Sequence, residues 1–201
     1  MKKNQLLFLT LAAAFIAVIA VMAFTPLGYL KVGVIEITFL VIPVVAGGFV
    51  LGKWGGLLLG TSFGLTSLFQ CFGFSPFGAA LLAVSPVRTA VVCLLPRMLL
   101  GFLAAWLFEG LSKTRLPVSV ASGLCGLVGS LVNTVGFVGL LILLFKDSAV
   151  ITDLMVQMET KNVLYFALLF AGVNSLAEAA ANTVVGAAVG PVMLRLKKSI
   201  R

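Results

Sequence analysis

The sequence predicts an all-α integral membrane protein: a single domain, residues 1–201, of six transmembrane helices with both termini in the cytoplasm. Hydrophobic residues make up 61% of the chain and charged residues only 10%, and the mean hydropathy is +1.21. These values lie well outside the range of soluble domains. Several apolar stretches approach the roughly 20 residues that a helix needs to cross a bilayer. None shows the alternating pattern of about 10 residues that is typical of a membrane barrel strand.

Six stretches are expected to be helical: 5–24, 35–51, 55–72, 88–110, 118–145 and 162–194. The first follows Lys2 and Lys3 and is too long for the apolar core of a secretory signal, so it is predicted to span the membrane. The second is short and carries Pro43 in its middle, so a kink or a re-entrant path is expected there. The glycine-rich residues 52–56 are expected to turn the chain into the third helix.

The third helix carries Gly56, Gly60 and Gly64 at intervals of four residues, on one face. Such a stripe of small residues is expected to let another helix of this chain approach closely. Turn-forming residues also follow the first helix, at 25–28, and precede the fourth, from Gly73 to Pro86. The connections 73–87 and 146–161 are expected to be loops on the side opposite the termini.

Basic residues predict the orientation of the chain, because cytoplasmic connections are enriched in Lys and Arg. The side of the termini holds nine: Lys2, Lys3, Lys53, Lys113, Arg115, Arg195, Lys197, Lys198 and Arg201. The other side holds four: Lys31, Arg88, Lys146 and Lys161. Both termini are therefore expected in the cytoplasm of a bacterial cell, with the chain in the cell membrane. The formal charge of +8 is scattered rather than gathered on one face, so no nucleic-acid partner is expected.

Arg97 and Glu178 lie inside expected spans, where a charge costs about 3 kcal/mol and usually serves a site or a paired network. At about 1.5 Å per residue from the cytoplasmic helix ends, Arg97, Asn133 and Glu178 lie at a similar height. Asn174 and Asn182 share a helix face with Glu178. These groups either line a cavity for a polar solute or form a structural network around an Arg97–Glu178 ion pair. One ion pair needs fewer side-chain amides than these helices carry, which favours the cavity over the structural network.

No catalytic constellation is visible in the sequence. The chain has no histidine, no nucleophile elbow and no phosphate-binding loop, and it has one intramembrane acid. Cys71, Cys93 and Cys125 fall in separate apolar segments, without the spacing of a metal or disulfide site, and are interpreted as small packing residues. We therefore expect no enzyme activity, no cofactor and no metal.

Several motifs carry a resemblance to a known family. They are IPVVAGG at 42–48, LGKWGG at 51–56, GTSFGL at 60–65, Ser85-Pro86 with Pro96-Arg97 and Gly101, GSLVNT at 129–134, and NSLAE at 174–178 with Gly190-Pro191. In order, spacing and topology the chain resembles the substrate-binding S components of energy-coupling factor (ECF) transporters, which import vitamins. The likeness covers nearly the whole chain.

The resemblance implies a six-helix bundle that holds a vitamin-like solute near the outer side, between the last three helices and the loop 25–35. Lys31, Glu36 and Gln70 complete the candidate substrate-binding set. The resemblance also implies docking on a transmembrane coupling subunit that carries two ATPase subunits, through alanines of the first helix, here Ala13 and Ala17.

The nature of the solute is suggested by Arg97, which can pair with a carboxylate, and pantothenate is therefore preferred. A thiamin-precursor pyrimidine, a pyridoxine-like ring, folate and a modified nucleobase remain open. A neutral solute is favoured if Glu178 neutralises Arg97. The alternative function is a stand-alone secondary carrier or small channel that uses the Arg97/Glu178 site.

Overall fold

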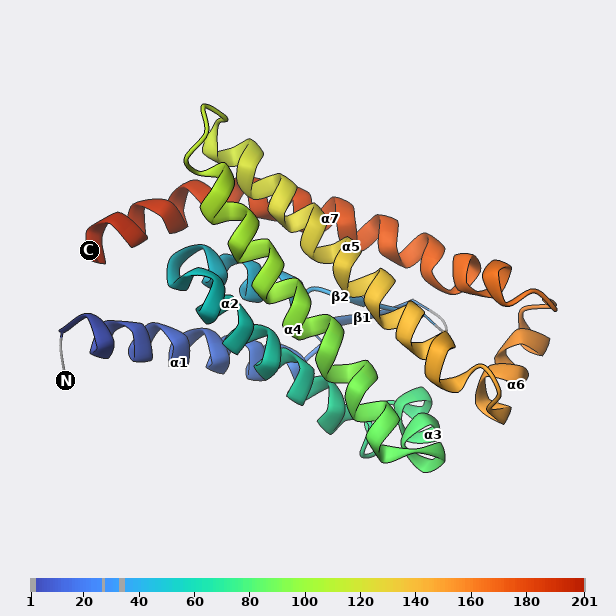
Figure 1. The fold of residues 1–201 in the computed structure, drawn as a ribbon. Helices are drawn as coiled ribbons and strands as arrows, with labels where there is room; N and C mark the ends of the chain where they lie inside the picture. Colours follow the sequence, from blue (N-terminus) through green and yellow to red (C-terminus); the bar gives the residue numbers. More distant parts are fainter. Residues whose placement is uncertain (1–2, 27, 33–34, 201) are drawn as a thin grey trace.

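The computed structural model describes residues 3–26, 28–32 and 35–200, which form a bundle of helices with one β-hairpin (Figure 1). In chain order the elements are α1 Lys3–Ala23, β1 Tyr29–Val32, β2 Ile35–Thr38, α2 Val41–Gln70, α3 Pro76–Val84, α4 Pro86–Leu111, α5 Val118–Phe145, α6 Ala149–Gln157 and α7 Val163–Ile200.

Among the described residues, five helices have a stretch long and apolar enough to cross a membrane: Gln5–Ala23, Val41–Gln70, Pro86–Leu111, Val118–Phe145 and Ser175–Lys198. The prediction of an integral membrane helical bundle is therefore confirmed. Residues 41–51 of the expected second helix and most of the expected third helix lie in the single helix α2, so the count of six crossings stays a prediction.

The helix α2 doubles back on itself at Gly52, which has φ 78° and ψ −175°. A Cβ placed on Gly48 would lie 3.5 Å from the Cα of Gly56, eight residues further along the chain. In a straight helix these residues would be about 12 Å apart along the axis. The arms 41–51 and 53–70 are thus antiparallel neighbours, and the turn predicted in the segment 52–56 is confirmed (Figure 1).

Replacing Gly52 with alanine is expected to lower the free energy of unfolding by about 1–3 kcal/mol, because a side chain strongly disfavours this backbone conformation. A Cβ there would also lie 2.6 Å from Oε1 of Glu109, which accepts a hydrogen bond from the amide of Lys53 at 3.3 Å. Thermal unfolding of the purified protein in detergent measures the effect. Gly110→Ala is the matched control, since a Cβ at Gly110 meets nothing within 4 Å. An unchanged melting temperature for Gly52→Ala would contradict the role given to this turn.

Two expectations for the second helix are wrong. Residues 35–38 form β2, which pairs antiparallel with β1, and the helix begins only at Val41. The β-branched residues Ile35, Ile37 and Thr38 favour the extended conformation. Pro43 therefore lies in the first helical turn, where a missing amide costs little, and the bend occurs at Gly52 instead.

The connections expected to be loops each contain a short helix. Ser75 and Pro76 begin α3, with Ser75 Oγ accepting from the amide of Gly78 at 3.3 Å. Ser148 begins α6 in the same way, accepting from the amide of Ile151 at 3.4 Å. A serine cap followed by proline is a typical helix start, so the sequence carried a signal for α3.

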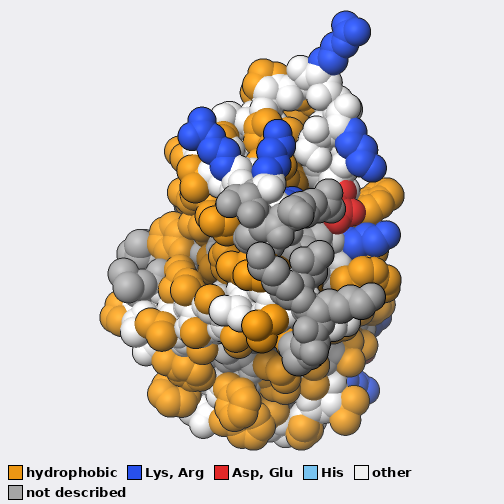
Figure 2. Space-filling view, turned by 90° about the vertical axis from the view of Figure 1, so that its left-hand side faces the viewer, with side chains coloured by type: hydrophobic (Ala, Val, Ile, Leu, Met, Phe, Trp, Pro, Cys, Tyr) orange, Lys and Arg blue, Asp and Glu red, His pale blue; other side chains and the backbone are white. Residues whose placement is uncertain are grey.

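The two ends of the bundle differ in composition. The start of α1, the end of α7, the bend of α2 and the connection between α4 and α5 lie at one end, whereas α3 and α6 lie at the other (Figure 1). Figure 2 looks onto the first of these ends and shows Lys and Arg side chains gathered there. The segments that meet there carry Lys53, Lys113, Arg115, Arg195, Lys197 and Lys198.

Candidate functional site

A cavity of about 460 Å³ lies among α2, α3, α4, α5, α6 and α7, with Thr38 of β2 also in its lining. Its volume lies in the range of about 300–1,000 Å³ that is typical of small-molecule sites. The polar lining residues include Thr38, Ser67, Gln70, Arg97, Asn133, Thr134, Ser175 and Glu178. Phe77, Phe137 and Phe170 supply an aromatic part of the wall. The cavity thus has the mixed lining expected of a site for a small polar solute.

Arg97 projects from the middle of α4 and is buried, with 8% of its surface exposed. Its NH1 donates a hydrogen bond to the carbonyl of Val92 at 2.9 Å. That carbonyl is free because Pro96, four residues later, has no amide hydrogen to donate. The Nε of Arg97 is buried without a partner. Within the described part of the chain, this single hydrogen bond leaves most of the five donors of the guanidinium available.

The charge of Arg97 is stabilised by aromatic rings. Its guanidinium carbon lies 4.7 Å from the ring centre of Phe137 and 5.5 Å from that of Phe63, distances typical of cation–π contacts. Among the described residues, no carboxylate oxygen comes within 4.0 Å of a nitrogen of Arg97. Arg97 and Glu178 therefore line one cavity without forming the direct ion pair considered above.

Glu178 lies on α7 and is 6% exposed. Its Oε1 accepts a hydrogen bond of 2.6 Å from the backbone amide of Thr38, at the end of β2. This bond fastens the β-hairpin to α7 beside the cavity. The carboxylate keeps further lone pairs for other donors, since an ionised carboxylate has about four acceptor positions.

The amides predicted for the site have different surroundings. Asn133, on α5, lines the cavity, is 5% exposed and has an Oδ1 without a partner. Gln70 also lines the cavity, and its Nε2 donates to the carbonyl of Ala23 at 2.6 Å, which ties the end of α2 to the end of α1. The side chains of Lys31, Glu36 and Asn174 lie outside the described residues.

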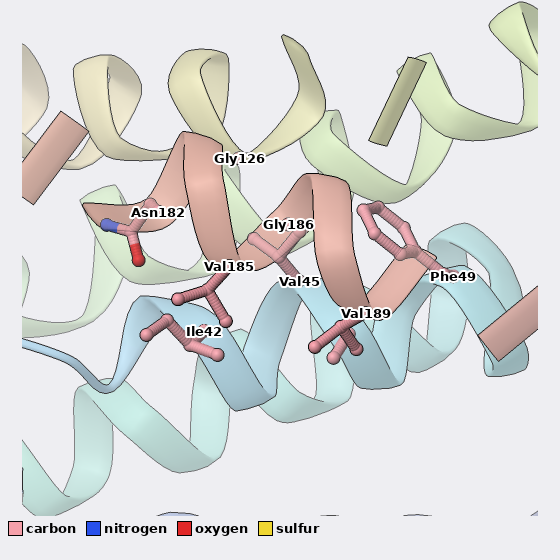
Figure 3. A pocket seen from close by; sticks show the side chains of 9 residues that line it. Ile42, Val45, Phe49, Gly126, Asn182, Val185, Gly186 and Val189 are labelled. Carbon is pink, nitrogen blue, oxygen red and sulfur yellow. The ribbon is translucent and has the colours of Figure 1, made fainter. Parts of the chain in front are cut away.

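The structure places Asn182 outside this cavity. Its Nδ2 donates to Ser130 Oγ at 2.8 Å and so links α7 to α5. It borders a crevice of about 10 Å³ between α2, α5 and α7, whose other walls are apolar or glycine (Figure 3). This volume is close to that of a single water and too small for a vitamin. Asn182 lies one helical turn from Glu178, yet it belongs to the packing of the bundle.

Several lining residues were not singled out from the sequence. Phe77 comes from α3, whose helical start at Ser75 and Pro76 was a usable signal. Phe137 lies one turn after Asn133, and the spacing of four could have placed both on one face. Thr38 has no sequence signal, because its role depends on the pairing of β2 with β1.

The first helix presents a distinct surface. Ala13 and Ala17 are exposed, whereas Ala12 and Ile19 on the opposite side are buried. Within the described part of the chain, α1 packs mainly against α2. Ala13 and Ala17 therefore face away from the bundle.

Comparison with known proteins defines the family. No curated protein matches the chain significantly. The family model described as "ECF transporter, substrate-specific component" matches residues 7–190, which is most of the chain. Together with the membrane-spanning helices, this match confirms the resemblance seen in the sequence. The chain belongs to the family of substrate-specific components of ECF transporters, which are multi-pass proteins of the cell membrane.

Proposed function

We propose that the cavity binds a small carboxylate-bearing solute, with pantothenate preferred, and that the chain captures it outside the cell for an ATP-driven importer. Membership of the family makes the chain a membrane substrate-binding subunit and implies association with the coupling and ATPase subunits. The observation that carries the choice of solute is Arg97, a cavity-lining cation that has no carboxylate partner among the described residues. An arginine binds a carboxylate through two parallel hydrogen bonds.

The remaining polar groups suit the rest of such a solute. Glu178 has acceptor positions beyond the one used by Thr38, and Asn133 keeps an unpaired Oδ1. Both can accept hydrogen bonds from hydroxyl or amide groups. Pantothenate offers two hydroxyls and one amide besides its carboxylate. Placing the carboxylate at Arg97 and the hydroxyls toward Glu178 keeps like charges apart.

The proposed topology has six crossings, with the two arms of α2 as the second and third and with both termini in the cytoplasm. The basic residues gathered at the terminal end support this orientation (Figure 2). The cavity is lined by α3 and by Leu154 of α6, which lie at the opposite end of the bundle. In this orientation the cavity belongs to the outer half of the membrane, where a solute is captured.

Direct binding tests the proposal. The purified full-length protein in detergent is titrated with isotopically labelled pantothenate, followed by competition with neutral vitamins and with a modified nucleobase. Saturable binding that only carboxylate-bearing competitors displace is the expected result. Mass spectrometry of small molecules retained through purification gives an independent identification. Retention of a neutral solute, with no binding of carboxylates, would overturn the choice of solute and leave the family assignment intact.

The alternative function is a stand-alone carrier or channel that uses Arg97 and Glu178. The two functions differ in their energy source. An S component moves its solute only with the coupling and ATPase subunits and with ATP, whereas a carrier responds to an ion gradient when reconstituted alone. Uptake into vesicles containing this chain alone, driven by a proton gradient, would favour the carrier.

Enlarging Ala17 to tryptophan is expected to reduce ATP-dependent uptake about 5- to 100-fold while leaving solute binding unchanged. The alanine face of α1 is proposed to contact the coupling subunit, and overpacking a close helix interface costs about 1–3 kcal/mol. Uptake by the assembled complex and binding by the isolated chain are measured in parallel. Leu143→Trp on α5 is the control, because Leu143 is also exposed but lies on another helix. Equal uptake by both variants would show that Ala17 is not part of the surface that contacts the coupling subunit.

A further inference from the structure

Two cysteines from separate helices meet at the wall of the cavity. The Sγ atoms of Cys71 and Cys93 lie 3.9 Å apart. Cys71 directly follows the last residue of α2, and Cys93 lies in the first half of α4. Both line the cavity and both are free thiols. Twenty-two residues separate them in the chain, so the close packing of α2 against α4 creates the pair.

We propose that Cys71 and Cys93 are an oxidisable dithiol that forms a reversible disulfide within the chain. A disulfide has an S–S length of about 2.0 Å, so the sulfur atoms must approach by about 2 Å. Rotation about the Cα–Cβ bond moves a cysteine sulfur over such distances without moving the backbone. The Cys71 thiol donates a hydrogen bond of 3.4 Å to the carbonyl of Ser67, and because a thiol is a weak donor, this bond opposes the rotation little.

The third cysteine provides an internal comparison. Cys125 lies on α5, is fully buried in the apolar core and is not among the residues that line the cavity. Among the described residues, Cys125 forms no close sulfur pair of the kind that joins Cys71 and Cys93. A small reagent entering the cavity meets Cys71 and Cys93 and not Cys125. In the proposed orientation the cavity belongs to the outer side, where conditions are more oxidising than in the cytoplasm.

Thiol–disulfide exchange with a small-molecule disulfide, such as oxidised glutathione, accounts for every atom and electron. The thiolate of one cysteine attacks a sulfur of the reagent, forms a mixed disulfide and releases one small thiol. The thiolate of the second cysteine then attacks the protein sulfur of the mixed disulfide, forms the Cys71–Cys93 bond and releases a second small thiol. The two protein thiols lose two electrons and two protons, and the reagent gains them.

The disulfide would join two walls of the cavity. Cys93 is four residues before Arg97 and thus on the same face of α4. Cys71 packs against α3, where a Cβ on Gly78 would lie 2.7 Å from its sulfur. Oxidation would therefore fix the end of α2 and the adjoining α3 to α4, one turn from the cation of the cavity.

The test counts thiols and maps the bond in the full-length protein. The protein in detergent is treated with oxidised glutathione, blocked with a maleimide, denatured and digested for mass spectrometry. Three free thiols are expected to fall to one, with a peptide that joins Cys71 to Cys93 and disappears on treatment with dithiothreitol. Cys125→Ser should give the same joined peptide. Cys71→Ser and Cys93→Ser should each give none, while keeping the melting temperature of the wild type.

Three free thiols after treatment, in a protein whose thiols react once it is denatured, would overturn the proposal. Disulfides formed only between chains, or a stable glutathione adduct on one cysteine, would also overturn it. The proposal uses the cavity and orientation given above but not the identity of the solute. The thiol count needs no solute, so it can fail while pantothenate binding succeeds, or the reverse.

Discussion

Arg97→Ala is expected to lower the affinity for pantothenate by at least about 100-fold, with the fold retained. The reason is the loss of two charge-assisted hydrogen bonds to the solute carboxylate, each worth about 1.5–3 kcal/mol, where about 1.4 kcal/mol corresponds to a factor of ten. The guanidinium has one recorded hydrogen bond to the protein, so its donors are available for this role. Equilibrium binding of labelled solute measures the loss, and thermal unfolding shows that the variant is folded.

Arg88→Ala is the matched control for this substitution. Arg88 lies on the same helix but is exposed, and its NH1 donates to the carbonyl of Leu144 at 3.1 Å. The control should bind solute like the wild type. Arg97→Lys should bind with intermediate affinity, because it keeps the charge but not the planar pair of donors.

Two outcomes would count against a binding role for Arg97. The first is wild-type affinity in Arg97→Ala. The second is an unstable Arg97→Ala together with a stable, solute-binding variant that combines Arg97→Met and Glu178→Leu. That second result would show that the two charges serve the structure through their longer-range attraction.

Gly60→Leu is expected to destabilise the protein by about 3 kcal/mol, the upper part of the usual range for overpacking, and to lower its yield from membranes. A Cβ at Gly60 would overlap the carbonyl oxygen of Arg97 on α4, and one at Gly56 would overlap that of Gly101. These contacts are with backbone atoms, so no side-chain rotation can relieve them. Thermal unfolding in detergent and recovery of monodisperse protein are the measurements.

Gly139→Leu is the control for the glycine stripe. A Cβ at Gly139 meets nothing within 4 Å, and the residue is exposed on α5. This variant should therefore unfold like the wild type. If Gly60→Leu also unfolds like the wild type, the approach of α2 to α4 is not set by these glycines.

Hydropathy and small-residue spacing predicted much of the fold. The expected helices 5–24, 88–110 and 118–145 coincide with α1, α4 and α5 to within a few residues, because long apolar runs are hard to place elsewhere than in a membrane. The stripe of Gly56, Gly60 and Gly64 was expected to pack within the chain, and its contacts with α4 confirm this.

Hydropathy and small-residue spacing did not predict the short helices or the hairpin. The helices α3 and α6 have nine residues each, too few to stand out in a search for spans. The hairpin has strands of four residues, and its stability depends on pairing between strands and on the contact with α7, neither of which is local. The conformation of these segments therefore depends on contacts with distant parts of the chain rather than on their local sequence.

The sequence predicted the level of the site residues along their helices but not the side of the helix on which each side chain lies. The rise along each helix placed Arg97, Asn133 and Glu178 at one level, and all three line the cavity. Which way a side chain points around its helix depends on the packing angles of the bundle. For that reason Asn182, although in register with Glu178, joins Ser130 instead, and the pairing of Cys71 with Cys93 had no sequence signal.

The hydrogen bond between Thr38 and Glu178 helps a non-helical segment of the chain to lie at the depth of the lipid acyl chains. Glu178 lies within the candidate span Ser175–Lys198, so the base of the hairpin is held at the depth of that span. Unpaired peptide groups cost several kcal/mol in lipid. The ladder between β1 and β2 and the carboxylate of Glu178 provide partners for these groups. In the proposed six-crossing topology, the arm 41–51, about 16 Å long, and a four-residue strand of about 13 Å have a combined length close to that of an acyl layer of about 30 Å.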